Sequence, residues 1–120
     1  MTCVLVVDDD ALLREMAARM LEHAGYRVVV AASAAQALAL VPTRPDINVA
    51  LIDVVLPGMS GFDLAARLRG LTPAVQIAFM SGFTGDHFKQ PVSDPCVAKP
   101  FTIEMLTRVV EEALGRSASG

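Results

Sequence analysis

Three carboxylates, one hydroxyl and one ammonium group stand directly after short apolar runs of the sequence, where buried strands would end. Asp8 and Asp9 follow the first run, Asp53 follows the third, and Ser81 and Lys99 close the last two. Carboxylates that meet at one corner repel one another unless a cation joins them, and oxygen ligands favour a hard ion such as Mg²⁺. Together with the hydroxyl and the ammonium group, they could hold a phosphoryl group during its transfer.

Asp53 is the carboxylate that could act as a nucleophile. Pro57 and Gly58 cannot continue a central strand, so the chain must turn there and leave the Asp53 side chain at the lip of the sheet. A carboxylate in this place can attack phosphorus and form an acyl phosphate. The alternative is that Asp53 only ends the strand or caps the turn, which is the commoner role of an isolated Asp.

Short apolar runs alternate with amphipathic segments along the chain. Runs of β-branched residues predict strands, and apolar residues at three- and four-residue steps predict helices. Strands are expected over residues 3–7, 26–31, 49–52, 74–80 and 96–98, and helices over residues 11–24, 34–41, 61–70 and 103–115. Gly85, Pro91 and Pro95 interrupt the stretch 83–95, so we expect a loop there with at most a short helix.

Each predicted helix has residues that can start or stop it. We interpret Asp10 as the cap of the first helix rather than a further metal ligand, and Gly25 as its end. Pro42 closes the second helix and Gly115 the last one. The remaining expected caps are Ser33, Ser60 and Thr102. The stripes expected to face the core are Leu12, Leu13, Met16, Ala17, Met20, Leu21 and Ala24, then Phe62, Ala65 and Leu68, and finally Ile103, Leu106, Val110 and Ala113 or Leu114.

This alternation of strands and helices predicts an α/β fold. Short connections require right-handed crossovers, so the strands should form a parallel sheet with helices on both faces. Ligands of such sheets lie outside the carboxyl ends of the strands, at the point where the strand order reverses. All the polar residues singled out above lie at such an end, so we expect one site there.

The composition fits a single domain and excludes several classes of function. A chain of 120 residues, 53% of them hydrophobic, can bury one core but not two. The formal net charge of −3 offers no basic stripe to a phosphate backbone, so we expect no nucleic-acid binding. No apolar run approaches the roughly 18 residues of a membrane span. We therefore expect no membrane anchor, no signal peptide and a cytoplasmic location. The two cysteines, Cys3 and Cys96, are expected to be small apolar side chains in strands.

Four motifs together resemble the response-regulator receiver domain of two-component signalling, over nearly the whole chain from residue 3 to residue 115. They are Val6-Val7-Asp8-Asp9, Asp53 with Pro57-Gly58, Ser81-Gly82 and Lys99-Pro100-Phe101. Each motif is weak alone, but each stands in order at the end of the right strand. The resemblance implies a flavodoxin-like fold with strand order 2-1-3-4-5, formed by residues 1–116, with residues 117–120 as a frayed tail or the start of a linker.

The resemblance also implies how the site works. Asp53 would accept a phosphoryl group from the phosphohistidine of a sensor histidine kinase or a histidine phosphotransfer protein. Ser81 would bond a phosphoryl oxygen, and Lys99 would neutralise the charge of the group. The domain would catalyse only its own phosphorylation and dephosphorylation, without turning over an external substrate. It would change its binding face on phosphorylation, for an output protein or a second copy.

The metal expected from the resemblance is Mg²⁺. It would be bound by Asp9, Asp53 and the backbone carbonyl of Val55, with Asp8 holding it through a water molecule. Val55 and Phe83 occupy positions that tune the phosphate lifetime in receivers, and two bulky apolar side chains there lead to the hypothesis that the acyl phosphate is screened from water.

Two departures from the family fall on one face. Receivers usually carry Tyr or Phe three residues before the lysine, and that ring turns inward on phosphorylation; here the position is Cys96, and Phe83 is a candidate substitute. The segment between Ser81 and Lys99 is also shorter than usual. The affected face, formed by the helix before the last strand, that strand and the final helix, is the one through which receivers commonly dimerise or bind an output partner. The family's strand order would also keep Cys3 too far from Cys96 for a disulfide.

Two alternatives remain open at this point. A degenerate receiver would bind a partner without being phosphorylated. A magnesium-dependent phosphatase of the haloacid dehalogenase-like group would need a second acid two residues after the nucleophile, where this chain has Val55. The string Phe79-Met80-Ser81-Gly82-Phe83 also resembles receivers attached to hybrid histidine kinases, so the chain could be a fragment of such a protein or a phosphate shuttle.

Overall fold

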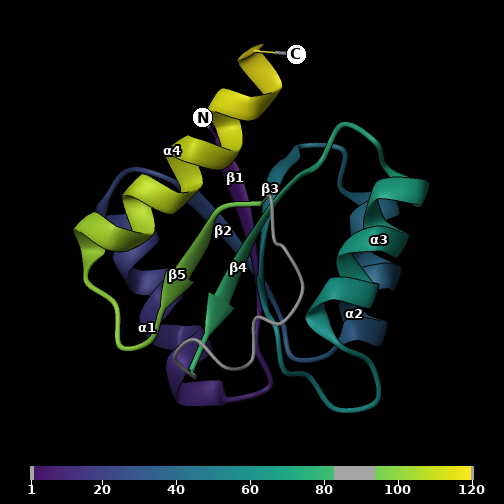
Figure 1. Ribbon diagram of the computed structural model, residues 1–120, viewed down its shortest axis with the longest axis horizontal. Coiled ribbons are helices and arrows are strands. Elements are labelled where there is room, and N and C mark those ends of the chain that lie inside the picture. The colour runs from purple at the N-terminus through teal and green to yellow at the C-terminus, as the bar shows by residue number, and fades with distance from the viewer. Residues whose placement is uncertain (1, 83–93, 120) are drawn as a thin grey trace.

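Five parallel strands form one sheet in the order β2-β1-β3-β4-β5 (Figure 1). The structure, a computed structural model, describes residues 2–82 and 94–119, the last four of them as backbone only. The strands are β1 (Cys3–Val7), β2 (Arg27–Ala31), β3 (Ile47–Asp53), β4 (Gln76–Ser81) and β5 (Cys96–Ala98). The predicted α/β fold class and the strand order are confirmed.

Helices cover both faces of this sheet, with α1 and α4 on one side and α2 and α3 on the other (Figure 1). They are α1 (Ala11–His23), α2 (Ala34–Leu40), α3 (Gly61–Leu71) and α4 (Ile103–Ser119), and a 3₁₀ turn, Val41–Thr43, follows α2. The predicted caps are confirmed by side chains that accept backbone N–H groups, as Asp10 does from Leu12 and Leu13. Ser33, Ser60 and Thr102 cap the other helices in the same way.

The core is divided into two clusters because successive strand residues point to opposite faces. In β1, Cys3, Leu5 and Val7 pack under α2 and α3, whereas Val4 and Val6 pack under α1 and α4. Strands β3 and β4 alternate likewise, so both faces of the three central strands are buried. The sheet is therefore a rigid support whose polar groups can emerge only at the ends of its strands.

The structure corrects part of the expected apolar stripe of α1. Ala17 and Leu21 are buried, but Leu12 is 67% exposed and Met16 is 41% exposed. The buried stripe of α1 is therefore narrower than the apolar stripe in its sequence. Two large apolar side chains are thus left at the surface near the amino end of α1.

The last helix does not end at the predicted residue. Helix α4 continues through Gly115 to Ser119, because a single Gly inside a helix costs only about 1 kcal/mol and does not by itself stop the helix. The division between a domain at 1–116 and a tail at 117–120 stays a prediction. The expected loop or short helix, with Phe83, lies mostly in residues 83–93, outside the described residues. Among the described residues, no helix is both long and apolar enough to cross a membrane.

Both described cysteines are free thiols, as expected, but they differ in environment. Cys3 is buried in β1, whereas Cys96 is exposed in β5. Cys96 thus lies in a strand, as expected, but it is exposed because β5 is an edge strand in which only Val97 is buried. Strands β1 and β5 are separated by β3 and β4, which keeps the two thiols apart.

Candidate functional site

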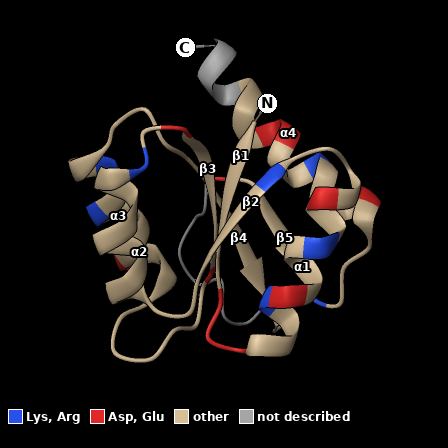
Figure 2. Ribbon diagram, turned by 180° about the vertical axis from the view of Figure 1, so that it is seen from behind, with Lys and Arg blue, Asp and Glu red and all other residues tan. Residues whose placement is uncertain are grey.

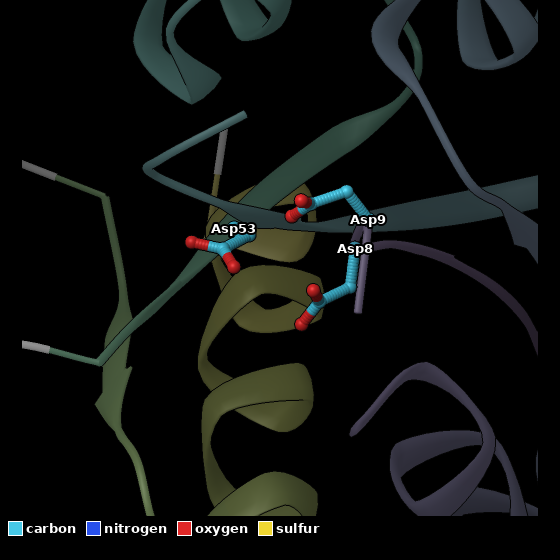
Figure 3. Close-up of side chains that lie close together, drawn as sticks. All are labelled: Asp8, Asp9 and Asp53. Atoms are coloured by element: carbon cyan, nitrogen blue, oxygen red, sulfur yellow. The ribbon is translucent and has the colours of Figure 1, made fainter. Parts of the chain in front are cut away.

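Three carboxylates converge at the carboxyl edge of the sheet (Figure 3). Strands β1 and β3 are parallel neighbours, and their register pairs Val7 with Ile52, so the next residues, Asp8 and Asp53, emerge side by side. One carboxylate oxygen from each of Asp8, Asp9 and Asp53 lies within 4.8 Å of the others. The predicted acidic cluster is thus present, and it follows directly from strand adjacency.

Lys99 lies between two of these carboxylates. Its Nζ donates to Asp53 Oδ2 at 2.7 Å and to Asp8 Oδ2 at 3.0 Å. The Lys99 backbone is fixed as well, because its N–H donates to the carbonyl of Ser81 at 2.7 Å. A side chain that starts beyond β5 therefore crosses the end of β4 and joins the ends of β3 and β1.

The electrostatic environment of Asp53 favours the neutral carboxyl more than water does. Burial raises the pKa of Asp53, opposed by hydrogen bonds from Lys99 and from the backbone N–H of Val55, while the charge of Asp8 raises the pKa further. Burial alone would lower the pKa of Lys99, but its bonds to Asp53 and Asp8 outweigh burial and raise that pKa. A cation arriving at this corner would relieve the repulsion between the carboxylates.

Asp8 is the most constrained of the three acids. It is fully buried, whereas Asp9 is exposed. Its Oδ1 accepts from the backbone N–H of Asp10 at 2.9 Å, its Oδ2 accepts from Lys99, and its backbone carbonyl accepts from Arg14 Nη1 at 2.9 Å. Asp10 is thus the predicted helix cap, and its backbone N–H supports the Asp8 carboxylate.

Gly61 fixes the loop that follows Asp53. A Cβ at this position would lie 2.2 Å from the Asp53 carbonyl oxygen and 2.8 Å from Val54 Cα. The Gly61 N–H donates to the Val54 carbonyl at 2.9 Å and closes the loop. Sequence reasoning identified Gly61 only as the start of a helix, although an unfavourable helix residue at that position was a signal for close backbone approach.

Ser81 and Val55, two further predicted site residues, differ in exposure. Ser81 is 1% exposed at the end of β4, whereas the Val55 side chain is 53% exposed after β3. An open hollow of about 250 Å³ lies above the cluster, and it is lined by Asp8, Asp9, Asp10, Leu13, Asp53, Val55, Gly82 and Lys99. Of the predicted site residues, the three acids, Val55 and Lys99 line this hollow. Ser81 is not among the lining residues, but the next residue, Gly82, is.

The donor set fits Mg²⁺. The three carboxylates supply hard oxygen ligands, and one oxygen of each is close enough to the others for one ion. Magnesium keeps several of its waters and takes few protein carboxylates, which suits an exposed Asp9 and an open hollow. These residues could hold the ion, and room remains for phosphate oxygens.

The fold and the site define the class of parallel α/β domains with an acidic corner and a lysine at the carboxyl edge of the sheet. The family model described as the response regulator receiver domain matches residues 4–111. The chain therefore belongs to the response regulator receiver family, a family of two-component signal transduction.

Relatives with known names agree with this assignment. The phosphate regulon transcriptional regulatory protein PhoB of Pseudomonas aeruginosa is 36% identical over 98% of this chain and 53% of its own length. The response regulator receiver protein CpdR of Brucella abortus is 30% identical over 92% of this chain and 95% of its own length. The sensor histidine kinase AruS of P. aeruginosa is 37% identical over 91% of this chain, but only 12% of its own length.

Solved structures show the same fold. A CheY-like receiver domain from Methanospirillum hungatei superposes with a TM-score of 0.83 at 27% identity, covering 99% of this chain and 98% of the other. The chemotaxis regulator CheY4 of Vibrio cholerae superposes with a TM-score of 0.81 at 29% identity, covering 94% and 98%. The chain thus matches whole receiver domains, while it spans about half of PhoB and a small part of AruS.

Proposed function

We propose that this receiver accepts a phosphoryl group on Asp53 from a phosphohistidine, with Mg²⁺ bound by Asp9, Asp53 and the backbone carbonyl of Val55, and by Asp8 through water. The observation that carries this proposal is the Lys99 ammonium group, 2.7 Å from Asp53 and 3.0 Å from Asp8 beside the exposed Asp9. An acceptor, a cation and metal ligands thus share one hollow.

The transfer makes one bond and breaks one. An Asp53 carboxylate oxygen attacks phosphorus, the bond between phosphorus and the imidazole nitrogen breaks, and the electron pair leaves with the imidazole. Bound Mg²⁺ would neutralise part of the charge on the phosphoryl oxygens. Lys99 already contacts Asp53, so its ammonium group can follow the negative charge from the carboxylate to the new phosphoryl oxygen. Ser81, buried at the next strand end, supplies a hydroxyl for a second oxygen.

The surface beside the hollow suits a protein phosphodonor. Leu12 and Met16 on α1 are exposed, and the exposed Val55 lines the hollow with Leu13. Exposed large apolar side chains close to a polar site favour contact with another protein. We infer that a sensor histidine kinase or a histidine phosphotransfer protein docks here. The relative AruS, which contains a similar segment, is named as a sensor histidine kinase.

The output side of the proposal concerns β5 and α4. Cys96 lies exposed there, in the place where receivers usually carry an aromatic ring, and a small hollow of about 160 Å³ adjoins it. We propose that an output protein or a second copy binds this face after phosphorylation. We infer that the domain turns over no external substrate, because the residue two positions after Asp53 is Val55 and not an acid, and the acids beside Asp53 in the described part of the chain are Asp8 and Asp9, which follow β1. A cytoplasmic location belongs to the same proposal.

The proposal is tested by intact-protein mass spectrometry after incubation with acetyl phosphate. The wild-type protein should gain one phosphoryl group with Mg²⁺ and none with EDTA, and hydroxylamine should remove the group because an acyl phosphate is labile to that nucleophile. The Asp53→Asn variant should gain nothing. No adduct under conditions that label a known receiver would support the degenerate, phosphorylation-independent alternative instead.

The docking surface is tested with the same assay and two donors. Leu12→Ser should slow transfer from a phosphorylated histidine phosphotransfer protein and leave labelling by acetyl phosphate unchanged, because a small donor needs no protein surface. Leu71→Ser is a matched control, since Leu71 is 58% exposed at the end of α3. Equal slowing by both variants, or none by Leu12→Ser, would contradict a docking role for α1.

A further inference from the structure

Arg14 contacts the site from outside the set of residues assigned so far. It lies in the first turns of α1, and its Nη1 donates to the backbone carbonyl of Asp8 at 2.9 Å. That carbonyl belongs to the peptide unit that joins Asp8 to Asp9. The orientation of this peptide plane sets the direction in which the Asp9 side chain leaves the backbone.

The other contacts of Asp8 make this bond informative. Its backbone N–H donates to the Ala31 carbonyl at 3.2 Å, and its carboxylate accepts from Asp10 N–H and from Lys99. Every polar group of Asp8 is thus hydrogen-bonded, and Arg14 binds the backbone carbonyl of the peptide unit shared with Asp9. The Asp9 carboxylate itself is exposed, with no hydrogen bond among the described contacts, so its position depends on the backbone that carries it.

A second arginine of the same helix behaves differently. Arg19 pairs with Glu15 at 3.1 Å, and its side chain is 77% exposed. This is an ordinary surface pair one turn apart on the helix, which contributes little. The two arginines carry the same charge on the same element, but only Arg14 is bound to the strand end.

We propose that Arg14 is a positioning residue of the metal site, which holds the Asp8–Asp9 peptide in the orientation that brings the Asp9 carboxylate to Asp53. This inference rests on the proposed function, because it assigns Arg14 to the Mg²⁺ site used there. The inference adds Arg14, a residue that would not contact the ion. It gives a reason for a positively charged side chain beside a site for Mg²⁺.

Charge and positioning predict opposite effects of removing Arg14. If Arg14 acted only as a positive charge near the acids, its loss would strengthen Mg²⁺ binding, because a nearby cation repels the ion. If Arg14 positions Asp9, its loss weakens binding. Outer-shell partners of metal ligands typically change metal affinity by about 10–100-fold. The removed charge offsets part of this, so we expect binding about three- to tenfold weaker.

The test is an NMR titration with MgCl₂ at constant ionic strength, followed on the backbone amides of residues 8–10 and 53–55. The variants are Arg14→Met, which keeps the apolar stem, and the control Arg19→Met, which removes the same charge from the same helix. Each is measured below its unfolding transition, as checked by circular dichroism. Arg14→Met should bind Mg²⁺ three- to tenfold more weakly than wild type, and Arg19→Met should bind as tightly or slightly more tightly.

Equal or tighter binding by Arg14→Met would overturn the inference, and so would equal weakening by both variants. A wild-type protein without Mg²⁺-dependent shifts overturns both the metal site and the role of Arg14. A protein that binds Mg²⁺ with the expected order of variants but gains no phosphoryl group fails only the proposed function. In the metal-free protein, amide exchange at Asp10 should also quicken in Arg14→Met and not in Arg19→Met.

Discussion

The two ends of β3 carry carboxylates in opposite situations. Asp46, directly before the strand, accepts from Arg44 Nε at 2.9 Å and Nη2 at 2.8 Å, with Arg27 at 3.8 Å. Asp53, the last residue of the strand, shares the single ammonium group of Lys99 with Asp8. Figure 2 shows acidic residues near both ends of the sheet's strands.

The pKa values of the two carboxyls shift in opposite directions for this reason. The hydrogen bonds from Arg44 lower the pKa of Asp46 to about 2, whereas burial raises the pKa of Asp53. At the amino end, two cations serve one partly exposed acid. At the carboxyl end, one cation serves two buried acids, and the unbalanced charge leaves a place for Mg²⁺ and a reactive oxygen.

The largest predicted effect concerns how rigidly the reactive end is held. Gly61→Ala should destabilise the fold by about 2–4 kcal/mol, the range of severe single substitutions with a named cause. The cause is the 2.2 Å approach of the new Cβ to the Asp53 carbonyl oxygen, a backbone atom that cannot rotate away. Urea denaturation followed by circular dichroism measures the change.

Gly70→Ala is the matched control for this variant. Gly70 lies in the same helix with nothing within 4 Å of its added Cβ, so the higher helix propensity of Ala should stabilise the protein slightly. A similar free energy of unfolding for the two variants would show that the close approach at Asp53 is not a constraint. The carboxyl end of β3 would then be no more tightly constrained than its amino end.

Much of the site could be predicted from the sequence because it depends on strand ends. Parallel neighbours bring their carboxyl ends to one edge, so Asp8, Asp9, Asp53 and Lys99 gather wherever the strand order is right. The caps could be predicted for a similar reason, because a cap is a local interaction within four residues. The fold class and the acidic cluster were of this kind, whereas the strand order was implied by the resemblance to the receiver family.

The remaining features of the site and surface depend on contacts between residues far apart in the sequence, which the periodicity of apolar residues does not predict. Lys99 bridges two acids that lie 46 and 91 residues away, and Arg14 reaches a backbone carbonyl that any residue would offer. Leu12 fits the apolar period of its helix but is 67% exposed. Arg69 also pairs with Asp94, 25 residues further along the chain. Such contacts follow from the packed fold.

The next prediction tests the charge imbalance at Asp53. In metal-free protein, Asp53→Asn should raise the free energy of unfolding at neutral pH by about 1–2 kcal/mol, the scale of gain from relieving a strained functional site. Because the folded-state pKa of Asp53 is raised, the wild type binds more protons when folded than when unfolded. This unfavourable contribution is absent below the ordinary Asp pKa of about 3.9 and grows as pH rises through the folded-state value.

Denaturation of both proteins at several pH values, with EDTA present, isolates this contribution. The advantage of Asp53→Asn should vanish near pH 4, because a protonated Asp and an Asn are similar in shape and charge. Saturating Mg²⁺ should also reduce the advantage at neutral pH, since the ion stabilises only the wild-type cluster. An advantage that is constant with pH would place its origin outside the titration of Asp53.

The smallest effect is expected at the amino end of β3, where the sign of the pH dependence is reversed. The Asp46 carboxyl carbon should titrate in NMR spectra at about pH 2. Its depressed pKa contributes stability that is complete above the ordinary Asp pKa and is lost as pH falls through about 2.

Arg44→Met should return the pKa of Asp46 toward the ordinary value, and Arg27→Met should change that pKa less, because Arg27 is 3.8 Å away. Stability at neutral pH should fall by less than this pKa shift alone implies, because solvent screens a partly exposed ion pair. If Asp46 of the wild type titrated at the ordinary Asp pKa, the contrast between the two ends of β3 would be contradicted. Neither Asp46 nor Asp53 would then have a pKa lowered by its arginine or lysine partner.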